Sequence, residues 1–249
     1  MSNTNWRAIV HVCGAAALAL AVSVLPSASS GTAQGEGASV VERRNKVRLQ
    51  KERIFQKDLR SAAAVSGTVV QRVPVPGGFV EDLASLVARS SEIVVGRLGP
   101  GRGRYVAGTP YVTSDYDLVV ETTLKGDARV GDNLTVVLLG GRAYFDDGTW
   151  AQTMLENFRA PIPGERILLF AKPTPLQISA DVRQRARAAN SVPLAPVSYL
   201  SGLIRLSESG RIDPGLYDGI AKEFVGQDVS DVLDVVMEQV KRLRGKRSR

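Results

Sequence analysis

Short apolar runs separated by glycine-containing turns fill the middle of this 249-residue chain, and they limit its possible folds more than any other feature. Strand-like runs lie at 65–73, 93–98, 111–124, 134–139 and 166–171, with a last one near 199–206. Turn glycines such as Gly126, Gly131 and Gly140 separate several of them. Short strands divided in this way are typical of a small barrel or sandwich. We therefore expect a mainly β protein with flanking helices, of the α+β class.

The C-terminal region carries the strongest helical pattern. After Asp228, apolar side chains recur at three- and four-residue spacing on one face: Val229, Val232, Leu233, Val236, Val240 and Leu243. Gly245 is expected to end this amphipathic helix. Shorter helices are predicted at 79–90 and 179–190, whereas 142–159 shows no regular pattern. Asp115 and Asp117 alternate along a predicted strand and are expected to face solvent.

The N-terminus resembles an export signal. Residues 8–25 are apolar or small apart from His11, and Arg7 precedes them. Pro26 ends the run, and small residues follow it, so cleavage is expected after Ser29 or Ala33. The sequence thus predicts an exported protein, periplasmic or extracellular. An uncleaved signal would instead form an N-terminal membrane anchor.

The only histidine and the only cysteine, His11 and Cys13, both lie inside this predicted signal. A mature chain without them cannot form a Ser-His-Asp triad, a Cys-His pair, a zinc finger or a histidine-ligated metal site. We expect no catalytic residue, no metal and no cofactor, and a fold that is stabilised by its core without disulfides.

The positive charge is concentrated near the two ends. The chain has 32 basic and 25 acidic residues, and eight of the basic ones lie between Val40 and Arg60 beside three acids. The last nine residues contain six bases and no acid. This placement argues against nucleic-acid binding. It suggests contact with an envelope polyanion, or peripheral membrane contact, while solvated helix surfaces are the alternative reading. The candidate contact residues are Arg43, Arg44, Lys46, Arg48, Lys51, Arg53, Lys241, Arg242, Arg244, Lys246, Arg247 and Arg249.

The segment 40–63 predicts a basic amphipathic helix or arm. A helical wheel gathers its apolar residues on one side: Val40, Val41, Val47, Ile54, Phe55, Leu59 and Ala62. Residues 74–78, Pro-Val-Pro-Gly-Gly, then form a linker or turn. The expected organisation is a signal peptide at 1–33, a basic helical arm and linker at 34–78, a barrel domain with its C-terminal helix at 79–245, and a basic tail at 246–249.

Three strand-and-turn segments resemble the netrin-like or tissue-inhibitor-of-metalloproteinases-like domain, which is similar to domains in many exported bacterial proteins. They are Glu92–Arg97 (EIVVGR), Val119–Gly126 (VVETTLKG) and Pro163–Phe170 (PGERILLF). The resemblance covers about a third of the chain and implies a small five-stranded OB-like barrel. Inhibitors of that family chelate the protease zinc through an N-terminal cysteine. The mature chain has none, so inhibition by that route does not carry over.

One loop offers candidate ligand-binding side chains. Asp146 and Asp147 lie between two aromatic residues, Tyr144 and Trp150, which together would suit calcium or a sugar. A solvated hairpin turn needs the same residue types, and a calcium loop supplies more oxygen ligands than are found here.

We therefore expect an exported, non-catalytic binding or interaction protein whose basic arms hold it near the anionic cell envelope. Its partner would be a protein or an envelope polyanion. Two alternatives stay open. One is an envelope hydrolase acting through carboxylates or a Ser-Lys pair, although Lys125, Lys172 and Lys222 lie in no Ser-x-x-Lys motif. The other is the calcium- or glycan-binding module.

Overall fold

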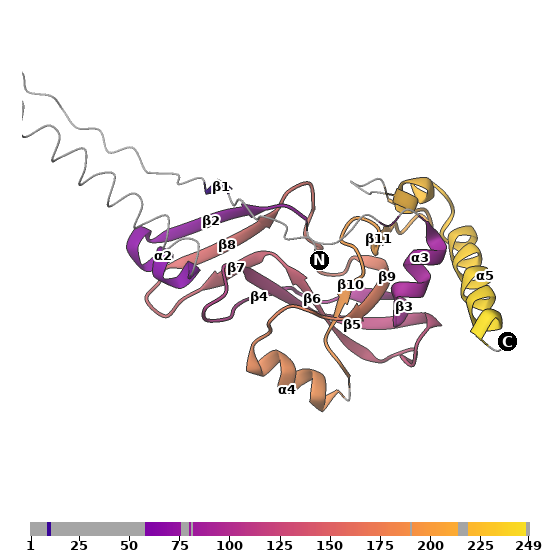
Figure 1. The fold of residues 1–249 in the computed structure, drawn as a ribbon, viewed down its shortest axis with the longest axis horizontal. Coiled ribbons are helices and arrows are strands. Elements are labelled where there is room, and N and C mark those ends of the chain that lie inside the picture. The colour runs from indigo at the N-terminus through magenta and orange to yellow at the C-terminus, as the bar shows by residue number, and fades with distance from the viewer. Residues whose placement is uncertain are drawn as a thin grey trace, which may run out of the picture.

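The computed structural model describes residues 9–10, 58–75, 80, 82–189, 191–213 and 219–247. Two β-sheets form the body of the molecule (Figure 1), with one sheet at one end and a barrel toward the other. Most of the predicted signal and basic arm, including the candidates from Arg43 to Arg53, lies outside the described residues, as does Arg249.

Five strands close into a barrel. Their order is β10-β6-β5-β3-β9, and β9 pairs again with β10 to complete the ring. Neighbours run antiparallel except β10 and β6, which are parallel. The strands are β3 (Glu92–Leu98), β5 (Val112–Lys125), β6 (Asn133–Leu139), β9 (Arg166–Pro173) and β10 (Leu194–Pro196). This Greek-key barrel of OB type confirms the predicted fold class.

The barrel strands bury side chains on both faces. Inside, Tyr116, Leu118 and Val120 alternate along β5 and pack with inward side chains of the other strands. Outside, the apolar side chains of β3 and β9 that point away from the barrel form a second core with two helices. Burial on both faces explains why 93–95 and 167–171 are continuous apolar runs rather than alternating ones.

Two short strands extend the barrel sheet: β4 (Arg102–Tyr105) on β5 and β11 (Leu203–Leu206) on β9. Residues 99–103, Gly-Pro-Gly-Arg-Gly, lead into β4, and Gly103 lies within the strand. A side chain at Gly103 would overlap the backbone carbonyl of Arg142, so glycine is required where the two sheets meet.

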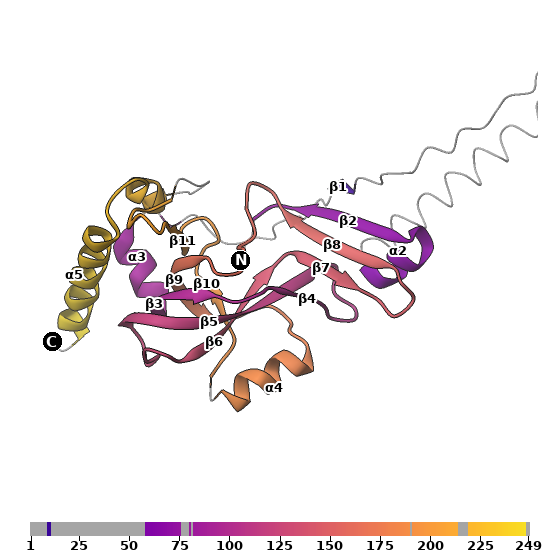
Figure 2. The same ribbon diagram turned by 180° about the vertical axis from the view of Figure 1, so that it is seen from behind.

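The C-terminal helix α5 (Val229–Arg247) packs beside α3 (Leu83–Arg89) at one end of the molecule, as Figures 1 and 2 show. A 3₁₀ turn, η1 (Gly219–Phe224), leads into it. The predicted apolar stripe is confirmed, because Val229, Val232, Val236 and Val240 are all buried. The expected stop at Gly245 was wrong, since the helix continues to Arg247.

Helix α4 (Ala180–Ala188) is inserted between β9 and β10 and lies against β6 on the other side of the barrel (Figure 1). Only Val182 and Ala186 of this helix are buried. Polar contacts, described below, provide the rest of its attachment.

The second sheet has the order β1-β2-β8-β7. Its strands are β1 (Ile9–Val10), β2 (Thr68–Val73), β8 (Trp150–Leu155) and β7 (Gly141–Tyr144). The reading of 142–159 as irregular was therefore wrong: β7 and β8 form a hairpin. Strand β2 pairs in parallel with β8, so residues before the predicted boundary at 78 share a sheet with residues after it.

Helix α2 (Leu59–Ser66) precedes β2 and buries Leu59, Ala62 and Ala63. The expectation of one helix from 40 to 63 fails at Asp58, whose backbone is extended. Its carboxylate accepts hydrogen bonds from the Arg60 amide and the Ser61 hydroxyl, which is the geometry of an N-cap. The apolar stripe thus continues through 59–62, but in a helix that begins at Leu59.

Candidate functional site

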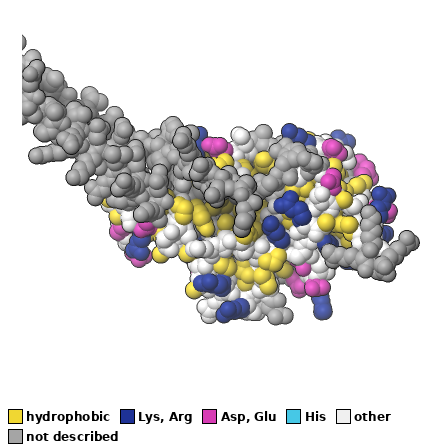
Figure 3. Space-filling model, viewed as in Figure 1, with side chains coloured by type: hydrophobic (Ala, Val, Ile, Leu, Met, Phe, Trp, Pro, Cys, Tyr) yellow, Lys and Arg dark blue, Asp and Glu magenta, His cyan; other side chains and the backbone are white. Residues whose placement is uncertain are grey.

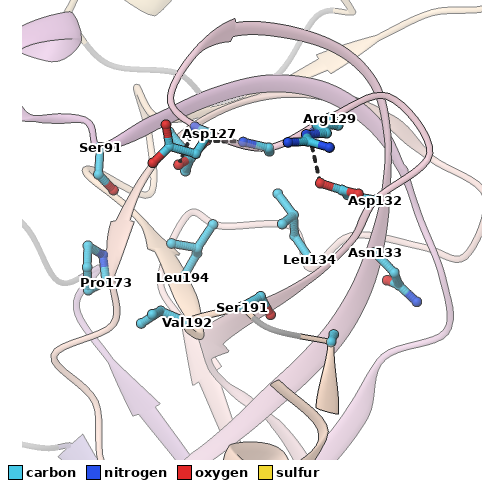
Figure 4. Close-up of a pocket in the computed structure, with 13 residues that line it drawn as sticks. Ser91, Asp127, Arg129, Asp132, Asn133, Leu134, Pro173, Ser191, Val192 and Leu194 are labelled. Atoms are coloured by element: carbon cyan, nitrogen blue, oxygen red, sulfur yellow. Dashed lines mark hydrogen bonds between the residues drawn. The ribbon is translucent and has the colours of Figure 1, made fainter. Parts of the chain in front are cut away.

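A cavity of about 670 Å³ opens at one end of the barrel, where β5 and β9 end and β3, β6 and β10 begin. The β5–β6 loop forms one wall, and the segment after α4 forms the opposite wall (Figure 4). Pockets of 300–1,000 Å³ are the usual size for small ligands or an inserted side chain. The volume and position make this barrel-end pocket the candidate binding site.

Apolar side chains line one side of the barrel-end pocket. Leu134 and Leu194 are the first side chains of β6 and β10 to enter the barrel core, and both are buried. Val192 and Pro173 lie beside them around the cavity (Figure 4). A ligand here can bury a short apolar stem against these groups.

Two carboxylates of the pocket hold the β5–β6 loop in place. Glu92 accepts hydrogen bonds from the backbone amides of Asp127 (3.1 Å) and Ala128 (3.4 Å). Asp132 accepts one from the amide of Arg129, at 2.7 Å. Hydrogen bonds from backbone amides to these carboxylates therefore fix the loop at both ends, so that it forms a defined wall of the pocket.

Other polar groups of the pocket remain available to a ligand. No hydrogen bond or ion pair joins the side chains of Asp127, Arg129 or Asn133 to other described residues. Three acidic residues, Glu92, Asp127 and Asp132, and one basic residue, Arg129, line the pocket. The pocket thus has a negative balance and suits a cationic or hydrogen-bond-donating group.

The sequence alone did not single out this pocket. The segments 125–127 and 130–133 read as polar turns, and nothing in them signals that Ser91, Ser191 and Val192 line the same cavity. Barrel closure between β9 and β10 brings these segments together. The only available signal was the number of acids and amides in one short loop.

The structure places the predicted ligand residues Tyr144, Asp146, Asp147 and Trp150 on the β7–β8 hairpin, away from the barrel-end pocket. Asp147 accepts bonds from the Thr149 amide (3.0 Å) and hydroxyl (2.6 Å), which lower the pKa of its carboxyl. Asp146 is exposed. Within the part of the chain that the structure describes, no three acidic, histidine or cysteine side chains gather to hold a metal ion.

Asp115 and Asp117 do not both face solvent as expected. Only 1% of the Asp115 side chain is exposed. Asp115 pairs with Arg102 (2.9 Å), Arg104 (3.2 Å) and Arg185 (2.5 Å), which come from β4 and α4. Asp117 pairs with Arg102, and Asp181 of α4 pairs with Arg104. We call these six side chains the arginine–aspartate network. It attaches α4 to the outer side of β5 at Asp115 and Asp117.

Lys125, one of the three lysines of the Ser-Lys alternative, is bound to the backbone at the end of a helix. The Lys125 ammonium donates to the backbone oxygens of Val87 (2.7 Å) and Ser90 (2.5 Å), at the C-terminal end of α3. Positive charge at that end of a helix is favourable. The Ser90 hydroxyl donates to the Leu86 oxygen, so this serine and lysine are not arranged as nucleophile and base.

The basic candidates that the structure reaches lie on the last turns of α5. Lys241, Arg242 and Arg244 are exposed, and Arg242 pairs with Glu238 one turn earlier. Lys246 and Arg247 continue the same helix. On the face shown in Figure 3, described Lys and Arg side chains lie in separate groups among hydrophobic and acidic ones. None of the described helices is long and apolar enough to span a membrane.

No protein-family model and no curated protein matches the chain. The assignment of function therefore rests on the geometry of the barrel-end pocket and on the charge pattern of the sequence.

Proposed function

We propose that this chain is an exported, non-catalytic binding protein whose barrel end receives a cationic side chain of a partner protein. The observation that carries the proposal is the pairing of three carboxylates with an apolar wall in one 670 Å³ pocket. A lysine or arginine side chain fits both parts of the pocket, because its apolar methylene stem can pack on the apolar wall and its charged tip can reach the carboxylates. The netrin-like resemblance is part of the same proposal, since OB-type barrels commonly act as interaction modules.

The basic ends hold the protein near the anionic cell envelope in this account. Support comes from the charge pattern of 40–60 and from the exposed basic side chains of α5. Each basic residue near an anionic surface contributes about 1 kcal/mol. Co-sedimentation of the full chain with isolated envelopes is therefore expected to fall as salt is raised. Binding that is independent of salt would remove the envelope part of the proposal.

The pocket is tested with calorimetry of the full chain and the peptide acetyl-Leu-Lys-Leu-amide. Asp127→Asn is expected to weaken binding about tenfold, the effect of losing one charge-assisted hydrogen bond. The control variant Asp234→Asn, at an exposed acid of α5, leaves binding unchanged. The peptide acetyl-Leu-Glu-Leu-amide should not bind. Equal binding of the two peptides, or equal loss in the two variants, would contradict the proposal.

A further inference from the structure

Within the described part of the chain, no element packs over one face of the second sheet, and α2 packs on the other. The register of the sheet places Tyr144 opposite Trp150 and Arg142 opposite Gln152 on β7 and β8. On β2, Thr68, Val70 and Arg72 lie opposite Trp150, Gln152 and Met154. Side chains of a strand alternate between faces, and the intervening residues Val69, Ala143 and Ala151 are buried. The other side chains form what we call the outer face: Thr68, Val70, Arg72, Arg142, Tyr144, Trp150, Gln152 and Met154.

Contacts with its neighbours orient Arg142 on β7, the edge strand of the second sheet. Its guanidinium carbon lies 4.3 Å from the centre of the Trp150 ring. It donates to the Gln152 side-chain oxygen at 3.0 Å and to the Tyr144 hydroxyl at 3.4 Å. No described carboxylate pairs with it. A guanidinium that is stacked and oriented in this way loses little conformational freedom when it binds an anion.

Arg72 provides a second positive charge on the same face. It is exposed and likewise pairs with no described carboxylate. It lies two strands away from Arg142 and two residues further along β8, which separates the two Cα atoms by roughly 12 Å. The eight side chains of the outer face include no Asp or Glu and carry a charge of +2. The nearest described acid along β8 is Glu156, which lies just beyond the strand and lines a hollow with Arg72 and Met154. The outer face is therefore complementary to a ligand with two or more spaced negative charges.

Aromatic and polar groups surround the two arginines. The Tyr144 side chain is 70% exposed and Met154 is 40% exposed, although both lie on a paired sheet. The C–H face of a sugar ring packs on an exposed aromatic ring, and amide and hydroxyl groups such as those of Gln152 and Thr68 bond to sugar hydroxyls.

From these observations we propose that the outer face binds acidic oligosaccharides, whose carboxylates pair with Arg142 and Arg72 while a sugar ring packs on Tyr144. The proposal is independent of the barrel-end pocket, which has the opposite charge and lies on the barrel. It also differs from the calcium or sugar site predicted at Asp146 and Asp147, because the residues proposed to contact the ligand lie on the strands and not in the loop.

Tryptophan fluorescence gives a local readout. The chain has two tryptophans, Trp6 and Trp150, so the full chain with Trp6→Phe reports on the outer face alone. Titration with tetragalacturonate is expected to change the Trp150 emission, because a carboxylate bound to the Arg142 guanidinium changes the charge beside the indole ring. The neutral sugar maltotetraose should give no change at the same concentrations.

Matched charge removal separates this face from the basic ends, which attract any polyanion. Arg142→Gln combined with Arg72→Gln should weaken binding at least about tenfold. Arg183→Gln combined with Arg187→Gln removes two exposed charges from α4 and should leave the titration unchanged. Absence of a Trp150 response, an equal response to maltotetraose, or an equal loss in both double variants would overturn the proposal. Circular dichroism of each variant confirms that it is folded.

Discussion

Helices α4 and α5 both pack against the barrel strands, but by different physical means. Helix α5 buries four valines in a core shared with α3 and with the outer faces of β3 and β9. Helix α4 buries one valine and one alanine and depends on the arginine–aspartate network for the rest. The first attachment is apolar and insensitive to salt, whereas the second depends on charge and geometry.

The difference shows why only one of the two attachments follows from the sequence. Valines at helical spacing predict which face of α5 is buried, without any knowledge of what packs against it. The partners of Arg185 lie 70 residues away, on a strand whose aspartates read as solvent-facing. A buried carboxylate is tolerated only where several donors meet it, and that meeting depends on tertiary structure.

The largest effect is expected from a charge in the α5 interface. Val236→Asp should lower the free energy of unfolding by about 4 kcal/mol, because it removes a fully buried side chain and inserts an ion in its place. Urea unfolding measures the change. The adjacent Val235 is 51% exposed, so Val235→Asp should change stability by less than about 0.5 kcal/mol. Similar losses in the two variants would refute the apolar account of α5.

A smaller loss of stability is expected when Asp115, at the centre of the arginine–aspartate network, loses its charge. Asp115→Asn removes the charge that faces Arg102, Arg104 and Arg185, and should cost about 3 kcal/mol in urea unfolding. Asp117 is 34% exposed, and Asp117→Asn should cost no more than about 1 kcal/mol. If both changes cost the same, Asp115 is not the centre of the network.

Acidification should loosen α4 before α5. The hydroxyl of Ser179 and the charge of Arg104 outweigh partial burial and lower the pKa of Asp181 below its usual value of 3.8. Because the folded-state pKa is the lower one, the stabilisation is complete above about pH 4 and is lost as pH falls through the folded value. Hydrogen exchange corrected for intrinsic rates should show faster α4 exchange at pH 3 than at pH 6. The variant Asp181→Asn should show a smaller change, and an equal response in α5 would count against the distinction.

The smallest effect is expected from salt. Pairs such as Arg104 with Asp181 are partly exposed and contribute about 0.2–1 kcal/mol each. Raising NaCl from 0.05 to 1 M should therefore increase hydrogen exchange in α4 severalfold. Helix α5 serves as the internal reference and should exchange no faster. Unchanged exchange in α4 would mean that Val182 and Ala186 suffice to hold it.

The sequence predicted elements whose pattern is local and failed where partners are distant. Strands β3, β5, β6 and β9 and helix α5 were placed because their apolar periodicity is complete within each segment. The hairpin turn at Asp146 and Asp147 was predicted, but the strands β7 and β8 on either side of it were not. Gly141–Tyr144 is short, and its strand character comes largely from pairing with β8.

Helix ends were the least predictable detail. Gly245 resembled a stop but lies within α5, and Asp58 looked like one more charged residue of a long helix but caps α2. Burial raises the pKa of Tyr105 to about 12, and its hydroxyl donates to the Asp58 carboxylate. That contact joins residues 47 positions apart, so no local pattern reveals it.

The central claim is that the barrel end binds a cationic side chain, and amide chemical shifts of the full chain test it directly. Titration with acetyl-Leu-Lys-Leu-amide should shift the resonances of residues around the barrel-end pocket, among them Ser91, Asp127, Asn133 and Ser191. The resonances of α5 should not move. Shifts that are confined to other surfaces, or their absence at millimolar peptide, would contradict the account.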